Sequence, residues 1–347
     1  MLKNDRCTFE QDDVTLLLTD ITGTINPKAT SERETLIQSG VHYSEMLPFE
    51  YKPSEEYLSE YNYALNEFAC ETASAVMLVA DKIYIAKKGR PVLVSLARAG
   101  TPIGILIKRY LYKKYNYSAP HYTISIVRGR GIDRNAMQHI IENHDVKSIQ
   151  FIDGWTGKGA ILNELSIEIA DFIGKHDKRL LLAVLADPAN VTEICGTHDD
   201  LPIASSFLNS TVCGLMSRTI MHPGIQNNEY HGVVFYENLR SEDKSYEFIE
   251  KIEKYFKFSE SYGMDEVIKI SIDFNIKDIN FIKPGIGETT RVLLRRVPDV
   301  ILISENALPK CISHIIKLAE EKEVPIIYYP LKQYQACGII KTLNPDL

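Results

Sequence analysis

Apolar positions recur at helical spacing in the first part of the chain. From Leu58 to Ile83, an apolar side chain stands at every third or fourth position along most of the run, which is the spacing of one face of an α-helix. Gly89 and Pro91 follow this run and end it. The residues before it are polar and irregular in pattern. We therefore predict an N-terminal extension over residues 1–90, with one long helix, that packs on the main domain.

Between residues 91 and 187, short apolar runs alternate with helical patterns. The apolar runs occupy 91–97, 121–127, 148–152 and 181–187, and the helical patterns include 101–115 and 160–174. Strands separated by helices predict a parallel sheet that is covered on both faces. Such sheets bind ligands at the carboxyl ends of their strands, so the residues just after each run are the candidates for chemistry. We assign this main domain to residues 91–260.

A second, smaller α/β pattern fills residues 264–347. Apolar runs and helical patterns alternate again, and one helix is predicted at about 309–322. The pattern predicts a compact three-layer α/β/α unit. This unit holds 11 Lys and Arg against 11 Asp and Glu, so it is neutral overall. Three arginines nevertheless crowd one predicted helix: Arg291, Arg295 and Arg296.

Charge and cysteine content narrow the function classes. The chain of 347 residues holds 39 Lys and Arg against 46 Asp and Glu, so no overall positive charge draws it to DNA or to an anionic membrane. Its six cysteines are dispersed, which is typical of a reducing compartment. No run approaches the length of a membrane span, and the first 20 residues lack a signal-peptide pattern. We expect a cytoplasmic protein without membrane contact, for which a homo-oligomer stays open.

A glycine-rich turn follows one of the predicted strands. Residues 148–160, SIQFIDGWTGKGA, combine a buried strand, an acid and glycines that open a helix. Backbone N–H groups at such a helix N-terminus converge on an anion, and glycines leave room for it. Thr156 adds a hydroxyl donor, and Asp153 is placed for sugar hydroxyls or a hydrated Mg²⁺. The alternative is a turn whose glycines serve geometry alone.

A second turn of this kind lies upstream, and a basic loop lies between the two. Residues 93–104, LVSLARAGTPIG, are a buried strand followed by Arg98 and a helix start. Residues 125–137, SIVRGRGIDRNAM, carry three arginines among two glycines. A mobile basic loop over two anion-binding turns suits a substrate with a phosphate and a pyrophosphate. The alternative for the three arginines is a solvated loop.

In order and spacing, these motifs resemble the type I phosphoribosyltransferase family. In that family, a strand ending in acids and followed by T-G-x-T/S holds the ribose and 5′-phosphate of phosphoribosyl pyrophosphate (PRPP), and an earlier R-A-G or R-G-G turn holds the pyrophosphate. Here LARAG and FIDGWTGKG stand in the same order, with 55 residues from Arg98 to Asp153. The resemblance covers about residues 90–190. Gly154 replaces the family's second acid, and Trp155 stands in a shorter loop.

The resemblance implies a reaction in which pyrophosphate is displaced from the anomeric carbon, with Mg²⁺ and basic side chains neutralising the leaving group. It implies catalytic roles for Arg98, Asp153, Arg128 and Arg130, with Asp153 also as the metal ligand, and no organic cofactor. It assigns to PRPP the residues Ala99, Gly100, Thr101, Asp153, Gly154, Trp155, Thr156, Gly157, Lys158 and Gly159. The acceptor is expected near Asp187, which either orients it or caps the following turn.

More narrowly, two further segments resemble a family of phosphoribosyltransferases associated with bacterial tellurium-resistance gene clusters. They are HYSEMLP at 42–48 and LNSTVCGLMSRT at 208–219. That family also carries the label StiP, a cysteine protease. A reactive thiolate needs a cationic or helix-N-terminal setting and a base. Cys213 is the candidate, with His198 and His222 as candidate bases, although a small buried cysteine is the commoner outcome at such a position.

The C-terminal segment 282–329 resembles the Pelota and kink-turn ribosomal-protein family of RNA-binding domains. That family has a G-x-N-E-x-T-K element that opens a helix reading bent RNA. Four positions match and Gly287 replaces the family's Asn. A glycine turn brings the backbone close to phosphates, while an acid accepts from base amino groups and an arginine neutralises phosphate. The resemblance assigns RNA contacts to Gly285, Gly287, Glu288, Thr290, Arg291 and Arg295; the alternative is a structural or dimerising unit.

Three function hypotheses follow. The leading one is a PRPP-dependent phosphoribosyltransferase on a parallel-sheet domain, acting on a base-like or RNA-linked acceptor that the Pelota-like domain brings to the site. The second is a regulator that senses PRPP or a nucleotide and binds structured RNA without turnover, which the loss of an acid at Gly154 favours. The third is a cysteine protease that uses Cys213.

Overall fold

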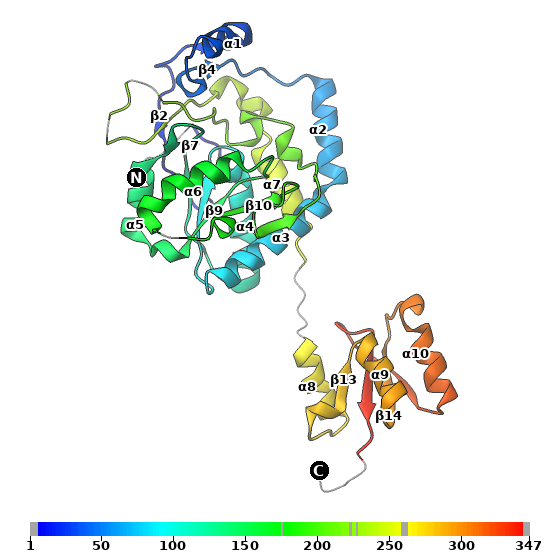
Figure 1. Cartoon of the computed structure of the whole chain (residues 1–347). Helices are drawn as coiled ribbons and strands as arrows, with labels where there is room; N and C mark the ends of the chain where they lie inside the picture. Colours follow the sequence, from blue (N-terminus) through cyan, green and yellow to red (C-terminus); the bar gives the residue numbers. More distant parts are fainter. Residues whose placement is uncertain (1–5, 175, 222–223, 227, 258–262, 343–347) are drawn as a thin grey trace. The chain divides into compact units, whose positions relative to one another are not determined.

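The computed structural model describes residues 6–342 apart from 175, 222–223, 227 and 258–262. The chain divides into two compact units, Met1–Phe256 and Lys257–Leu347 (Figure 1). Residues 6–90 therefore belong to the same compact unit as the main sheet.

A six-stranded parallel sheet forms the centre of the first unit. Its order is β1 (Thr15–Leu16), β6 (His121–Ile124), β5 (Val92–Leu96), β9 (Ile149–Ile152), β10 (Leu182–Ala186) and β11 (Ile194–Thr197). All five residues of β5 and of β10 are buried. Strands that are buried on both faces read as continuous apolar runs, which is why the sequence pattern located them.

Helices cover both faces of this sheet (Figure 1). On one face, α3 (Ala69–Ala86), α4 (Gly100–Tyr115) and α7 (Ser245–Glu253) share a core with alternate strand residues such as Leu93, Ile152 and Leu185. On the other, α5 (Arg134–Asn143) and α6 (Ala160–Ile173) pack on Val94, Phe151 and Val184. The predicted parallel sheet with two covered faces is confirmed.

The predicted single helix of the N-terminal region is two helices, α2 (Glu55–Glu67) and α3. Ser54 caps the first of them, since its hydroxyl accepts from the Tyr57 backbone N–H at 3.2 Å. Only Phe68 leaves helical dihedral angles, and its N–H still donates to the Ala64 carbonyl oxygen. The apolar period runs through this kink, so periodicity alone could not reveal it.

The predicted basic loop is an antiparallel hairpin of β7 (Ile126–Val127) and β8 (Gly131–Ile132). The remaining elements of this unit are short. They are β2 (Thr19–Asp20) paired with β12 (Gly232–Val233), β3 (Pro27–Lys28) paired with β4 (Leu47–Pro48), helix α1 (Thr30–Gln38), and the 3₁₀ turns η1 (Tyr43–Glu45), η2 (Val146–Ser148), η3 (Lys178–Leu180), η4 (Ala204–Ser206), η5 (Ser210–Val212) and η6 (Glu237–Glu242).

The second unit is the predicted three-layer α/β/α structure. Its sheet has the order β13 (Ile282–Pro284), β16 (Ala336–Ile340), β14 (Pro298–Ser304) and β15 (Ile326–Tyr329), with only β14 and β15 parallel. Helix α8 (Gly263–Asp273) packs on Val300 and Leu302, while α9 (Ile286–Arg295) and α10 (Pro309–Glu321) pack on Ile301 and Ile303. The 3₁₀ turn η7 (Ile279–Phe281) precedes β13. Across the residues described, no helix is long and apolar enough to span a membrane.

Candidate functional site

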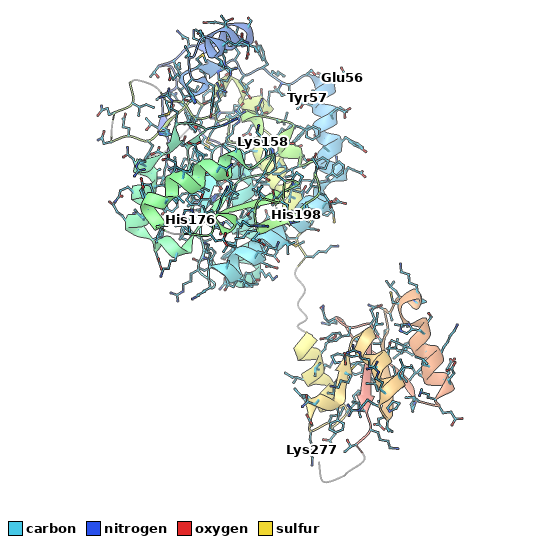
Figure 2. The ribbon with its side chains drawn as sticks, in the orientation of Figure 1. Glu56, Tyr57, Lys158, His176, His198 and Lys277 are labelled. Carbon is cyan, nitrogen blue, oxygen red and sulfur yellow. The ribbon has the colours of Figure 1, made fainter. Side chains whose placement is uncertain are left out.

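Asp187, Cys195 and His198 meet at the carboxyl ends of β10 and β11. Cys195 is the second residue of β11, and His198 directly follows that strand. The Cys195 Sγ lies 3.6 Å from Nε2 and 3.9 Å from Nδ1 of the His198 ring. Cys195 is only 3% exposed, whereas the side chain of His198, which Figure 2 labels, is 54% exposed. The thiol therefore lies just below an imidazole that solvent reaches.

Asp187 sets the orientation of this imidazole. His198 Nδ1 lies 2.9 Å from the Asp187 carbonyl oxygen, so Nδ1 is the donor and Nε2 remains an acceptor facing the thiol. The Asp187 carboxylate accepts from the backbone N–H groups of Val191 and Thr192 at 2.8 and 2.9 Å. It also accepts from the Thr156 hydroxyl. Its carboxylate thus caps the following turn, which is the second of the two roles considered for it.

The electrostatic setting keeps the Cys195 thiol protonated. Burial raises the pKa of this thiol above its ordinary value, and the nearby Lys82 ammonium opposes the rise. Lys82 Nζ donates to the Cys195 carbonyl oxygen at 2.9 Å. Because the thiol is protonated at neutral pH, nucleophilic attack needs a base that takes its proton. His198 Nε2 is in position to do so.

The same three side chains are the one group within the described ranges whose ligand atoms could surround a metal ion, since these atoms lie within 4.8 Å of one another. A thiolate and an imidazole suit Zn²⁺. The Asp187 carboxylate, however, already accepts three hydrogen bonds. Asp153, the expected Mg²⁺ ligand, is not in this group, and its metal role stays a prediction.

The ends of β5 and β9 carry a different set of charged groups. The Arg98 guanidinium donates to the Asn209 side-chain oxygen and, at 3.4 Å, to the Met216 carbonyl oxygen. The Asp153 carboxylate accepts from the Gly154 backbone N–H at 2.8 Å. Burial outweighs this bond and raises the pKa of Asp153 to about 7. Neither charged group has an ion-pair partner among the described residues.

Cys213, the predicted nucleophile, lies close to Arg98 but in the apolar core. It is 3% exposed and packs with Val212 and Met216. Burial raises the pKa of Cys213 to about 12, although the Arg98 charge acts in the opposite direction. No described histidine lies within hydrogen-bond distance of its thiol, and His222 lies outside the described residues. His198, its other candidate base, contacts Cys195 instead.

The upstream glycine turn serves packing. Gly100 begins α4, and a Cβ on it would stand 2.4 Å from the Ile152 carbonyl oxygen. Glycine is therefore required there by the neighbouring strand β9. Thr101 is fully buried, and its hydroxyl accepts from the Thr123 hydroxyl at 3.1 Å. Ala99 is the residue before the helix and makes no side-chain cap.

The downstream turn does open a helix, as predicted. Gly159 precedes α6 with a φ of +77°, and a Cβ on Gly157 would meet no atom within 4 Å. The Thr156 hydroxyl, expected on a phosphate, is bound to Asp187. Six of the seven residues predicted for PRPP from this turn line one pocket of about 240 Å³: Asp153, Trp155, Thr156, Gly157, Lys158 and Gly159, of which Lys158 is labelled in Figure 2. Gly154 does not line this pocket.

The two predicted catalytic arginines of the basic segment lie at the tip of the β7–β8 hairpin. Arg130 forms an ion pair with Glu45 at 2.7 Å. The Arg128 backbone N–H donates to the Tyr43 hydroxyl at 3.0 Å, and the Arg128 carbonyl oxygen lies 3.1 Å from His42 Nε2. These contacts tie the tip of the hairpin to η1, while the predicted mobility of this segment and the catalytic roles of Arg128 and Arg130 stay predictions.

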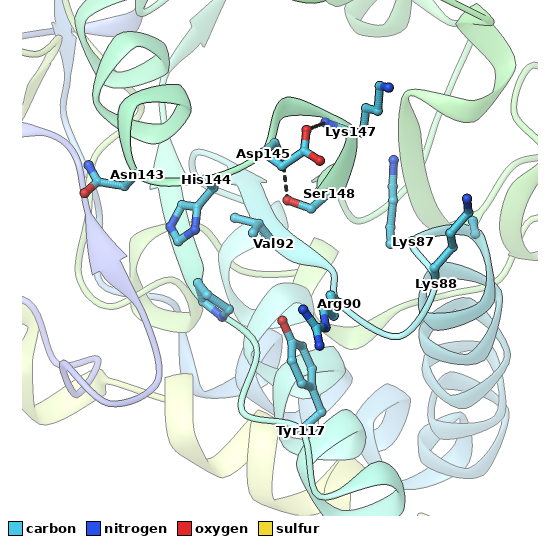
Figure 3. Close-up of a pocket in the computed structure, with 12 residues that line it drawn as sticks. Lys87, Lys88, Arg90, Val92, Tyr117, Asn143, His144, Asp145, Lys147 and Ser148 are labelled. Atoms are coloured by element: carbon cyan, nitrogen blue, oxygen red, sulfur yellow. Dashed lines mark hydrogen bonds between the residues drawn. The ribbon is translucent and has the colours of Figure 1, made fainter.

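A further pocket of about 550 Å³ opens at the amino ends of β5, β6 and β9 (Figure 3). Lys87, Lys88, Arg90 and Lys147 line it, and burial lowers the pKa of Lys87. Tyr117 reaches its wall and donates to the Pro91 carbonyl oxygen at 3.2 Å. Since the candidate thiols belong to the opposite edge of the sheet, this pocket is separate from them.

The residues predicted for RNA contact run along α9, from Gly285 before its start to Arg295 at its last position. Gly285 precedes the helix with a φ of +93°. Arg291 and Arg295 are exposed, and Arg291 forms an ion pair with Glu288 at 2.8 Å. The Thr290 hydroxyl donates to the Ile286 carbonyl oxygen at 2.7 Å and lies 3.0 Å from His314 Nε2. A Cβ on Gly287 would meet nothing within 4 Å.

Comparison with known proteins gives two family matches. Residues 7–253 match the family described as "Tellurite-like stress resistance cysteine protease StiP". Residues 261–342 match the "PELOTA RNA binding domain" family. A curated relative from Acinetobacter baylyi, "Cysteine protease StiP", is 32% identical over 367 residues, which cover 97% of this chain and 94% of the relative.

These matches correct the leading function hypothesis. The prediction of a PRPP-dependent phosphoribosyltransferase is wrong, because both the family and the relative are described as cysteine proteases. The physical source of the error is that a glycine turn after a parallel strand also arises from packing, as at Gly100. Cys195 was missed, although a Cys-x-x-His spacing that begins eight residues after Asp187 was available as a signal.

Proposed function

Because this chain belongs to the StiP family, we propose that it is a cysteine protease in which Cys195 is the nucleophile, His198 the general base, and Asp187 the residue that orients the base. The observation that carries the assignment is the 3.6 Å separation between Cys195 Sγ and His198 Nε2. Among the described residues, no other cysteine has a histidine ring within hydrogen-bond distance. A nucleophile beside a base that a third group orients is the general arrangement for covalent catalysis.

The proposed reaction follows from the protonation states. His198 Nε2 takes the Cys195 proton as the sulfur attacks the peptide carbonyl carbon, so a C–S bond forms. The protonated ring then gives this proton to the leaving amine as the C–N bond breaks. A water molecule, deprotonated by the same ring, hydrolyses the thioester and releases the carboxylate and the thiol. The Asp187 carbonyl keeps Nδ1 as the donor throughout.

Cys213 is a weaker candidate for the same chemistry. Its pKa of about 12 leaves almost no thiolate at neutral pH, and its described surroundings hold no base. Arg98 is the one nearby group that lowers this pKa. A guanidinium stays protonated and cannot accept the thiol proton.

Covalent capture distinguishes the two thiols. We would treat the full chain with a fluorescent peptide-like electrophile and map the modified cysteine by mass spectrometry. Capture should fall on Cys195, disappear in Cys195→Ala and persist in Cys213→Ala. Selective capture of Cys213, or peptide hydrolysis that survives in Cys195→Ala, would overturn the assignment. A chelator should not reduce hydrolysis, because no metal takes part in the proposed steps.

We further propose that the C-terminal unit binds structured RNA through helix α9. The Pelota match and the exposed Arg291 and Arg295 support this proposal. In the full chain, Arg295→Ala should weaken RNA binding and lower its salt dependence by about one ion. Lys277→Ala is the control, since Lys277 follows α8 on the other face of the sheet. Equal salt dependence in both variants would contradict the assignment.

A further inference from the structure

Three arginines gather beside the end of β5: Arg33 on α1, Arg98, and Arg218 in the segment after η5. The Arg218 guanidinium lies 5.1 Å from the centre of the Tyr43 ring, and its Nη2 donates to the Tyr43 carbonyl oxygen at 2.6 Å. Burial, together with the charges of Arg33 and Arg98, lowers the pKa of Arg218 to about 10. All three arginines stay partly exposed. The three positive charges are therefore close together and poorly solvated, but a ligand can still reach them.

This arginine cluster has no counter-charge of its own. Among the described residues, none of the three arginines forms an ion pair, and the oxygens they contact are neutral carbonyl and amide oxygens. The Nε atoms of Arg33 and Arg218 are buried without a hydrogen-bond partner. A buried donor left without a partner is costly, so such groups usually mark a place where a ligand completes the network.

Glu50 and Asp153, whose charges act on Cys213 together with that of Arg98, form no ion pair with the cluster. The charge of Glu50 acts on Tyr236, as that of Arg218 does. The Glu50 carboxylate accepts hydrogen bonds from the backbone N–H and the hydroxyl of Ser210, both at 3.0 Å. Asp153, with a pKa of about 7, is largely protonated at slightly acidic pH. The cluster thus presents an unfilled site for one external oxyanion. A carboxylate fits it well, because two guanidinium groups can each donate a pair of parallel N–H bonds to its oxygens.

We propose that Arg33, Arg98 and Arg218 bind the carboxylate of an acidic side chain in the peptide substrate, which makes the enzyme selective for Glu- or Asp-containing peptides. This inference rests on the proposed protease function. Arg98 follows β5 and His198 follows β11, and three strand spacings separate these strands, about 14 Å. An extended peptide covers that distance in about four residues. The selected acid is therefore expected about four residues from the cleaved bond.

Two readouts test the site and the protease function separately. The first compares kcat/KM for quenched-fluorescent peptides that are neutral except for one Glu, moved position by position, with the matching Gln peptides. For wild type, kcat/KM should be at least about tenfold higher for the Glu peptide than for the Gln peptide at one position, because one charge-assisted hydrogen bond contributes about that much. Arg218→Met should bring this ratio close to one, and Arg33→Met, on the surface helix α1, should also reduce it. Arg240→Met is the control, since Arg240 pairs with Glu237 elsewhere.

The second readout is the anisotropy of the same labelled peptides bound to Cys195→Ala, which needs no turnover. Tighter binding of the Glu peptide there, without any hydrolysis by wild type, would retain the site and reject the protease function. Hydrolysis of Glu and Gln peptides at equal rates would retain the protease and reject the site. A phosphoserine peptide that binds more tightly than the Glu peptide would overturn the assignment to a carboxylate.

Discussion

The carboxyl edge of the main sheet has two halves with similar residues in different surroundings. The outer half, at β10 and β11, holds Asp187 and Cys195, and the inner half, at β5 and β9, has Asp153 and Cys213 nearby. The Asp187 carboxylate accepts three hydrogen bonds, whereas the Asp153 carboxylate accepts one from the described residues. Cys195 has an imidazole beside it, and Cys213 has a guanidinium.

The two halves of the edge therefore differ in what they are suited to do: the outer half holds its side chains in fixed positions, and the inner half leaves donors available for a ligand. In the outer half, each polar group is held by the chain itself, so the base and the thiol have a fixed relation before any substrate arrives. In the inner half, the Nε donors of Arg33 and Arg218 have no hydrogen-bond partner, and the pKa of the Asp153 carboxyl is raised by burial. A polar cluster that the fold leaves incomplete is suited to binding an external group. The outer half therefore fits chemistry and the inner half recognition.

The largest expected effect concerns the Cys213 thiol. With a pKa of about 12, its thiolate fraction at pH 8 should be about a thousandfold below that of an ordinary cysteine. Alkylation by iodoacetamide, followed by mass spectrometry, should show Cys213 protected in the folded chain by at least this factor relative to the chain in urea. The half-buried Cys70 and Cys311 are the internal references. If Cys213 in the folded chain is alkylated as fast as Cys70 and Cys311, the proposed contrast between the two halves is wrong.

His198→Gln should lower kcat by at least about a hundredfold, which is a typical contribution of a general base. Gln keeps a polar side chain of similar size but cannot take the thiol proton. His176→Gln is the matched control, because His176 is a surface histidine that contacts Ser166 and the Gly174 carbonyl oxygen. Peptide hydrolysis at saturating substrate measures both variants. If both variants keep full activity, the outer half does not perform the chemistry.

Asp153→Asn should remove a pH dependence of stability of about 2 kcal/mol. The folded pKa of about 7 lies above the ordinary value near 4, so the folded state binds the proton more tightly than the unfolded state. Burial of Asp153 therefore does not lower the free energy of unfolding below about pH 4, where the carboxyl is protonated in both states. It lowers this free energy progressively as the pH rises from 4 to 7. Urea unfolding at pH 5 and pH 8 should show the variant more stable than wild type at both pH values, with an advantage that grows by about 2 kcal/mol from pH 5 to pH 8. An identical pH slope in both proteins would show that Asp153 ionises freely.

The sequence located most of the fold because burial and periodicity decide it. Strands such as β5 and β10 are buried throughout and therefore read as apolar runs, and α4 and α6 follow the predicted turns closely. The kink at Phe68 leaves no trace in the apolar period. The hairpin after β6 was taken for a loop because two-residue strands with glycines carry little pattern.

The candidate site was harder to predict because it depends on which side chains meet. The sequence pointed to Asp153, Asp187 and Arg98 as ends of strands, and the structure places them there. It could not show that His198 bends back toward Cys195, because that contact depends on the turn after β11. It also could not show that Arg33 and Arg218, far apart in the chain, lie close together.

The smallest expected effect concerns the two glycine turns of the inner half. Gly100→Ala should destabilise the first unit by at least about 1 kcal/mol, because the new methyl group would stand 2.4 Å from the Ile152 carbonyl oxygen and force the strand and helix apart. Gly157→Ala should change stability little, since its Cβ would enter open space. Thermal or urea unfolding of both variants measures the difference. If Gly157→Ala proves as destabilising as Gly100→Ala, the downstream turn is packed more tightly than the structure indicates. If neither variant loses stability, close packing against β9 does not require glycine at position 100, and packing does not explain why this turn resembles an anion-binding turn.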